Sequence, residues 1–271
     1  INILFIARNK KKSADLKLLL EKKYDIKVDY FLSDFNDLNS IKIAIQNLLK
    51  KNITIDCLVN NAGKVYFSYG KTKDNLERSF QINYLSHFYL AEKLIQEKVL
   101  LENSQVLNVS SVAHSPNSSI NSLDNIKHKK LVGQINFEDI NYEKEKLRGF
   151  TGLFYSRSKM SQIMWTYHRS KSLKSIKINS IHPGLLGSNV IFDNGLLGKI
   201  LTPLFKLFFR SSKEGAKNIM FVIEKISQEK ITGKYFDERV ISQSHEFSYV
   251  TENQKKLFDI SKKLLSEREI D

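Results

Sequence analysis

Short apolar runs alternate with amphipathic stretches along the whole chain. The apolar runs predict strands at Asn2–Ala7, Lys27–Phe31, Asp56–Asn60, Gln105–Ser110, Ile176–Ser180 and Lys234–Phe236. Helical periodicity predicts helices over 13–23, 38–50, 74–99, 153–171, 212–227 and 253–266, with Ser13 and Asp37 as N-caps. Strands joined by crossover helices are typical of a parallel α/β sheet covered on both faces. We therefore predict a single doubly wound domain over residues 1–271, without repeats or linkers.

Two stretches interrupt this regular pattern. Residues 113–135 are rich in Ser, Asn and Lys and predict a surface loop. The segment Gly195–Arg210 is strongly apolar with interspersed bases, and an ordinary core helix is one interpretation of it. Its place between His182-Pro183-Gly184 and the helix at Ser212 equally favours a substrate lid over 189–211 that also touches a membrane. Such a lid implies a lipophilic substrate.

The charge and the cysteine content of the chain restrict the partners it can bind and the cellular compartment it can occupy. The net charge of +14 is compatible with nucleic acid or an anionic membrane, but the lysines are scattered and no RNA-binding or zinc pattern accompanies them. We therefore predict neither a nucleic-acid partner nor a metal site. Cys57 is the only cysteine, which excludes an internal disulfide and favours a reducing compartment, either the cytoplasm or the cytosolic face of an intracellular membrane. No run reaches the roughly 20 apolar residues of a membrane helix.

Polar motifs directly follow three of the predicted strands. They are Asn60-Asn61-Ala62-Gly63, Asn108-Val109-Ser110-Ser111 and His182-Pro183-Gly184. Because the carboxyl ends of parallel strands share one edge of a sheet, these motifs are expected to meet there. Gly63 allows a ligand to approach the backbone, and the asparagine side chains can pin neighbouring strands, although a plain strand-to-loop turn is the alternative.

A fourth motif, Tyr155-Ser156-Arg157-Ser158-Lys159, places a phenol and an ammonium on one face of a predicted helix. The ammonium is expected to lower the pKa of Tyr155 from about 10 towards neutrality, which suits proton transfer. Ser111 can donate a hydrogen bond to a substrate oxygen. A lone pair of this spacing occurs by chance in many proteins, but its place in the ordered set favours chemistry over packing.

Asn83 lies among apolar residues in the middle of a predicted helix. A buried amide is costly unless it is hydrogen-bonded. Asn83 therefore either caps a kink or distorts the helix so that it serves Lys159 through water.

In this order the four motifs resemble the short-chain dehydrogenase/reductase family, and Val112-Ala113-His114 and Gly233-Lys234-Tyr235-Phe236 resemble its retinol dehydrogenase-like branch. The resemblance implies a Rossmann-like fold. It also implies a catalytic tetrad, with Tyr155 as proton donor or acceptor and Ser111 holding the substrate oxygen, and its members are Asn83, Ser111, Tyr155 and Lys159. The implied activity is an NADP(H)-dependent oxidoreductase that interconverts a lipophilic alcohol, of retinol, steroid or fatty alcohol type, and its aldehyde or ketone. Helices 74–99 and 153–171 would pair in a homodimer.

The resemblance also assigns a cofactor site. Lys159 and Tyr155 would face the nicotinamide ribose. Asp34 would contact the adenine, and the adenosine side of the site would be formed by Asn60, Ala62 and Gly63. The nicotinamide would be held by Pro183, Gly184 and Ser188, where Ser188 stands at a position that is commonly Thr in the family. Arg8 follows the first strand, where NAD-preferring sites carry an acidic residue, so we predict NADP over NAD; a merely basic turn is the alternative.

Two departures from the family stand out. Ser111 and Tyr155 are 44 residues apart (155 − 111), which predicts an insertion around 115–132. The family's first strand and Gly-rich loop are missing, because Ile1 begins what matches its second strand. That strand would lie between Asn2–Ala7 and Asp56–Asn60, so two unpaired edges are expected in the core, and we predict an N-terminally truncated form of a longer protein. A non-catalytic binding or scaffold protein that lost the phosphate loop is the alternative, against which the tetrad argues.

Overall fold

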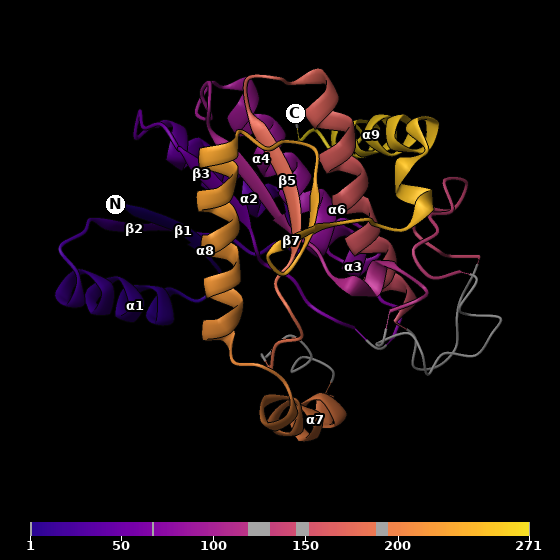
Figure 1. Cartoon of the computed structure of the whole chain (residues 1–271), viewed down its shortest axis with the longest axis horizontal. Helices are drawn as coiled ribbons and strands as arrows, with labels where there is room; N and C mark the ends of the chain where they lie inside the picture. The colour runs from indigo at the N-terminus through magenta and orange to yellow at the C-terminus, as the bar shows by residue number, and fades with distance from the viewer. Residues whose placement is uncertain (1, 67, 119–130, 145–151, 188–194, 271) are drawn as a thin grey trace.

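A layer of parallel strands lies between helices in the computed structural model, which describes residues 2–66, 68–118, 131–144, 152–187 and 195–270 (Figure 1). The strands are β1 Ile3–Ala7, β2 Val28–Leu32, β3 Cys57–Asn60, β4 Gln105–Val109, β5 Lys177–His182, β6 Tyr235–Asp237 and β7 Val240–Ser242. All neighbouring pairs are parallel except β6 and β7. The six predicted strands are confirmed to within two residues. The sequence-based analysis missed β7, a three-residue strand that returns on β6 after Glu238, whose φ is +54°.

The strands form two separate sheets. One has the order β1-β2 and the other the order β3-β4-β5-β6-β7. Along the described ranges nothing pairs with the second edge of β1 or of β3, so the expected pair of unpaired edges is confirmed. The consequence is visible in burial, because every residue of β1 is half-buried whereas every residue of β4 is buried. In Figure 1, β1, β2 and α1 lie together at one side of the molecule.

The helices follow the predicted periodicity. They are α1 Lys10–Lys23, α2 Leu38–Leu49, α3 Arg78–Phe80, a π-helix Gln81–Leu85, α4 Ser86–Gln96, α6 Leu153–Ser172, α7 Gly195–Phe208, α8 Ser212–Glu229 and α9 Thr251–Ser266, with 3₁₀ turns at Val112–His114 and Glu246–Tyr249. The described part of the predicted lid, from residue 195 on, contains a helix, α7, while its residues 189–194 lie outside the described ranges. No helix in the described ranges combines the length and the apolar character that crossing a membrane requires.

One of the two predicted N-caps is correct. The Asp37 side chain accepts from the Ser40 N–H at 3.1 Å at the start of α2. The prediction of Ser13 is wrong, because α1 begins at Lys10 and Asn9 caps it by accepting from the Lys12 N–H at 2.9 Å. The Ser13 hydroxyl instead donates to the Asn9 carbonyl at 2.8 Å. Lysine is a good helix former, so the three lysines extend the helix back to the better cap.

Helix α6 crosses the main core and is buried on nearly all its faces. On one side it packs against α9 of the same chain, and Phe258 of α9 lies 5.5 Å from the ring of Phe88 in α4 and 4.7 Å from that of His168 in α6. The face shared by α4 and α6, which the sequence suggested for a homodimer, is therefore covered by α9. A dimer through this face stays a prediction, and it would require α9 to move.

Candidate active site

The carboxyl ends of β3, β4 and β5 are tied to one another and to α6 by buried amides. Asn60 at the end of β3 donates to the Asn108 Oδ1 at 2.8 Å, and Asn108 donates to the Thr166 Oγ1 of α6 at 2.9 Å. The predicted pinning of neighbouring strands by asparagines is confirmed. It fixes α6, and with it Tyr155 and Lys159, against the strand ends that carry the other motifs.

Ser111, Tyr155 and Lys159 are brought together at this edge. Ser111 is buried, and interaction with its side chain acts on the pKa of Tyr155. The Lys159 Nζ lies 5.6 Å from the centre of the Tyr155 ring. It donates to the Val109 carbonyl at 2.7 Å and to the Gln162 Oε1 at 3.1 Å. Burial lowers the pKa of Lys159 from 10.5 to about 7, so its charge is easily lost.

The pKa of Tyr155 shifts opposite to the expected direction. Burial raises it to about 12, and the opposing effect of Ser111 is smaller. The predicted lowering of the Tyr155 pKa by Lys159 is therefore not found in this structure. Burial penalises the phenolate, and the lysine ammonium is directed at the Val109 carbonyl. Tyr155 consequently carries its proton at neutral pH.

Asn83 lies at the centre of the π-helix, so the predicted helix distortion is confirmed. Its Oδ1 accepts from the Lys64 N–H at 2.8 Å, and its Nδ2 donates to the Lys64 carbonyl at 2.9 Å and to the Ser158 Oγ at 3.0 Å. A Cβ on Gly63 would lie 3.2 Å from the Asn83 Oδ1 and 3.4 Å from the Lys159 Nζ. The loop after β3, the π-helix and Lys159 thus form one compact group.

His114 positions the Ser111 backbone, a role that the sequence-based analysis missed. Its Nδ1 bonds the Ser111 carbonyl at 2.6 Å, and its Nε2 accepts from the His245 N–H at 3.2 Å. These two contacts require the neutral tautomer with the proton on Nδ1. Burial lowers the pKa of His114 to about 4, which keeps it neutral. The signals in the sequence were its place three residues after Ser111 and its membership of the Val112-Ala113-His114 run.

Two cations and one acid mark the ends of the first three strands. Arg8 follows β1, Asp34 follows β2 and Lys64 follows the loop after β3. Burial and then the charge of Arg8 lower the pKa of Lys64 from 10.5 to about 8, and Asp34 opposes them, so the three side chains are electrostatic neighbours. Sequence reasoning missed Lys64, although a cation directly after Gly63 was a readable signal. This cluster is suited to an anion.

The loop after β5 carries the remaining predicted residues. The Pro183 carbonyl accepts from Asn218 at 3.0 Å, and Gly184 has a φ of +103° that favours glycine. Ser188 lies outside the described residues. In the described part of the chain, the His182 Nδ1 and the Gln162 Nε2 are buried without a hydrogen-bond partner. They are free to bond a ligand at this edge. On the other side, the Ala62 carbonyl bonds the His87 Nε2 at 2.7 Å.

A cavity of about 330 Å³ adjoins the turn after Ser111. Its lining is mostly polar and comprises Val112, His114, Ser115, Asn117, Ser118, Tyr235, Asp237 and Gln243. The predicted insertion over 115–132 begins at this cavity, while its residues 119–130 lie outside the described ranges. The polar lining is suited to the oxygen-bearing end of a substrate.

The chain is similar to known proteins along most of its length. The family model described as "short chain dehydrogenase" matches residues 1–122. Human retinol dehydrogenase 12 is 30% identical over 207 residues, which are 76% of this chain and 59% of that protein. The chain thus spans about three fifths of the length of this relative.

Two further comparisons extend the match. The short-chain dehydrogenase TIC 32 B of Brassica napus chloroplasts is 26% identical, and the match covers 97% of this chain and 81% of that protein. The NADPH-bound carbonyl reductase from chicken fatty liver superposes with a TM-score of 0.58 at 19% identity, covering 89% of this chain and 87% of that chain. At that identity the structural match concerns the fold alone.

Proposed function

Because this chain belongs to the short-chain dehydrogenase/reductase family, in its retinol dehydrogenase-like branch, we propose that it is an NADP(H)-dependent oxidoreductase acting on CH–OH groups. It interconverts a lipophilic alcohol and its aldehyde or ketone. The observation that carries the proposal is the arrangement of Ser111, Tyr155 and Lys159 at one strand edge, with Asn83 in a π-helix beside them.

The residues at this edge fit a nicotinamide cofactor. Gly63 leaves space directly beside Lys159, two buried polar atoms of His182 and Gln162 await partners, and Arg8 and Lys64 are suited to phosphate. The residues proposed to hold the cofactor are Arg8, Asp34, Asn60, Ala62, Gly63, Tyr155, Lys159, Pro183, Gly184 and Ser188. When bound, the cofactor supplies or accepts the hydride.

The chain's own residues handle the proton. Ser111 donates a hydrogen bond to the substrate oxygen, and Tyr155 gives its phenolic proton to the same oxygen as the carbonyl is reduced. Because the pKa of Tyr155 is raised to about 12, the acid form is ready at neutral pH, which favours reduction. Asn83 is a positioning residue that acts through Ser158 and the Lys64 backbone.

The lipophilic substrate is supported by human retinol dehydrogenase 12 among the relatives and by the apolar face of α7. The test is NADPH oxidation with retinal, a medium-chain aldehyde and a short polar carbonyl compound, using the full-length protein. We expect turnover of the first two and little of the third. Preference for the polar compound would refute the substrate class, and no turnover of any would favour a non-catalytic binding protein.

Arg8→Asp is expected to reverse the cofactor preference. The substitution places a carboxylate where we propose the 2′-phosphate, so the ratio of kcat/KM with NADPH to that with NADH should fall about tenfold or more. Lys11→Asp, which makes the same charge change in the exposed first turn of α1, is the matched control and should leave the ratio unchanged. An unaltered ratio in Arg8→Asp would refute NADP as the preferred cofactor.

Helix α7 is proposed to make the peripheral membrane contact. Leu196, Ile200, Pro203 and Leu207 follow i, i+4, i+7 and i+11 spacing, so they share one face. Leu196 is 75% exposed, Ile200 56% and Leu207 76%. Residues 195–210 contain no acid and include Lys199 and Lys206. An exposed apolar stripe flanked by bases suits an anionic bilayer surface.

Vesicle flotation with phosphatidylcholine and phosphatidylserine tests this contact. Leu196→Asp/Leu207→Asp should weaken binding by about tenfold or more, because two apolar side chains no longer enter the bilayer. The control Leu18→Asp/Leu19→Asp changes two leucines of α1 that are 66% and 59% exposed, and it should bind as the wild type does. Equal loss in both variants would show that α7 is not the contact.

A further inference from the structure

A second site lies at the opposite end of α6 from Tyr155. Lys171 is 16 residues after Tyr155, which places it about 24 Å along the helix axis. There α6, the turn before β6, strand β7 and the 3₁₀ turn Glu246–Tyr249 line an open cavity of about 480 Å³. This volume is within the range of small-molecule sites.

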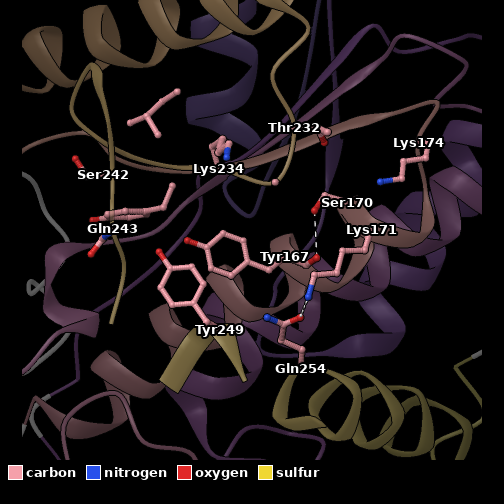
Figure 2. A pocket seen from close by; sticks show the side chains of 13 residues that line it. Tyr167, Ser170, Lys171, Lys174, Thr232, Lys234, Ser242, Gln243, Tyr249 and Gln254 are labelled. Atoms are coloured by element: carbon pink, nitrogen blue, oxygen red, sulfur yellow. Dashed lines mark hydrogen bonds between the residues drawn. The ribbon is translucent and has the colours of Figure 1, made fainter. Parts of the chain in front are cut away.

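Three lysines from two parts of the chain line this cavity. Lys171 and Lys174 come from the end of α6 and the residues after it, and Lys234 comes from the turn before β6. Figure 2 shows Lys171 and Lys174 on one side of the cavity and Lys234 on another, around the paired rings of Tyr167 and Tyr249. The helix dipole attracts cations to the end of α6 and explains Lys171, but it does not explain a lysine that comes from the turn before β6.

Within the described structure, no acidic residue lines the cavity beside these lysines. The other lining residues are Tyr167, Ser170, Thr232, Gly233, Tyr235, Ile241, Ser242, Gln243, Tyr249 and Gln254, none of which is acidic. Lys171 donates to the Gln254 Oε1 at 3.1 Å and the Thr251 Oγ1 at 3.3 Å, both neutral. Over the described ranges none of the three lysines forms an ion pair, although Lys side chains elsewhere on the surface pair repeatedly. Clustered cations repel one another unless an anion joins them.

Two further observations indicate a built site. Tyr235, whose side chain is only 3% exposed, lines both this cavity and the one beside Ser111, and its hydroxyl has no hydrogen-bond partner within the described structure. Gly233 has a φ of +68°, and a Cβ there would lie 2.6 Å from the Ser170 Oγ. The glycine thus lets the turn that carries Lys234 approach the end of α6, which brings the three lysines around one cavity.

We propose that this cavity binds the phosphate group of a small organic phosphate. Three ammonium groups supply the charge for a dianion, and the Thr232 hydroxyl and the Gln243 side-chain amide supply further hydrogen-bond donors. The ligand is either a soluble phosphomonoester or a phospholipid headgroup, which share this chemistry. The site is separate from the cofactor cluster at Arg8 and Lys64 and does not depend on the proposed reaction.

Calorimetric titration with glycerol 3-phosphate tests the proposal. Lys171→Gln/Lys174→Gln/Lys234→Gln should bind about tenfold or more weakly than the wild type, and the single Lys234→Gln, on an exposed side chain, should show a smaller loss. The matched control is Lys255→Gln/Lys256→Gln/Lys263→Gln, which removes the same charge from α9. It should bind as the wild type does, and so should Arg8→Asp, because the cofactor cluster is elsewhere.

A second arm identifies the source of the phosphate. Vesicles with phosphatidic acid are tested in the Leu196→Asp/Leu207→Asp background, which removes the proposed α7 contact. Binding of glycerol 3-phosphate without vesicle binding assigns a soluble phosphomonoester, and lysine-dependent binding of both assigns a headgroup. If the lysine variants bind both probes as their parents do, or if Arg8→Asp abolishes the titration, the site does not exist.

Discussion

Replacing Tyr155 by phenylalanine is expected to lower kcat/KM for NADPH-dependent carbonyl reduction by about a hundred- to ten-thousand-fold. Phenylalanine keeps the ring and its packing on α6 but removes the hydroxyl that interacts with Ser111 and carries the transferred proton. The ring that is proposed to face the cofactor stays in place, so the affinity for NADPH should fall much less than kcat does. Steady-state kinetics with retinal, together with NADPH titration, measure both quantities.

The control for this variant is Tyr30→Phe in β2. Tyr30 stacks on Phe5 at 5.6 Å, far along the chain from Ser111, Tyr155 and Lys159, so loss of its hydroxyl should leave kcat unchanged. Turnover of Tyr155→Phe at the wild-type rate would mean that another group supplies the proton. The mechanism proposed here would then be wrong, whatever the cofactor and substrate.

Replacing Lys159 by methionine is expected to abolish activity and, at the same time, to remove a pH-dependent penalty on folding. Methionine matches the length of the buried stem but carries no charge. The pKa of Lys159 falls from 10.5 to about 7 on folding because burial disfavours the ammonium. Burial of Lys159 therefore lowers the free energy of unfolding of the wild type at low pH, by on the order of a few kcal/mol below pH 7.

The direction in which stability changes with pH determines which two pH values should be compared. Between pH 7 and 10.5 the unfolded chain binds more protons at Lys159 than the folded chain does, so wild-type stability rises with pH across this window. The measurement is the free energy of unfolding in urea at pH 7 and at pH 10. The value for Lys159→Met minus the value for the wild type should be more positive at pH 7 than at pH 10. The Val109 and Gln162 acceptors lose their donor in the variant, but that cost does not depend on pH.

An exposed lysine provides the reference for this comparison. Lys10→Met, at the exposed start of α1, should shift stability equally at the two pH values. If the difference between wild type and Lys159→Met were also the same at pH 7 and pH 10, Lys159 would keep its ordinary pKa in the folded protein. The account of a buried, easily neutralised lysine would then fail.

Local pattern predicted most of the fold and the type of each candidate catalytic residue. The strands were found to within two residues because apolar runs between polar helical stretches have few other ways to be buried. Asp37 was recognised as a helix N-cap because it directly precedes a helical pattern, and Asn83 as a helix distortion because it is a polar residue among apolar ones. The strand-end positions of Asn60 and Ser111 followed from the geometry of parallel sheets alone.

Contacts between distant parts of the chain were beyond such reasoning. The proximity of Arg8 and Lys64, the cover that α9 forms over α4 and α6, and the meeting of Lys171 with Lys234 all join residues far apart in sequence. The predicted direction for Tyr155 failed for the same reason. The sequence spacing showed the Lys159 ammonium four residues after Tyr155, whereas the pKa of Tyr155 depends mainly on its burial in the folded protein. The sequence by itself determined which groups are present and on which element each lies. Only the tertiary structure decided their solvation and their partners, because desolvation and charge act through space rather than along the chain.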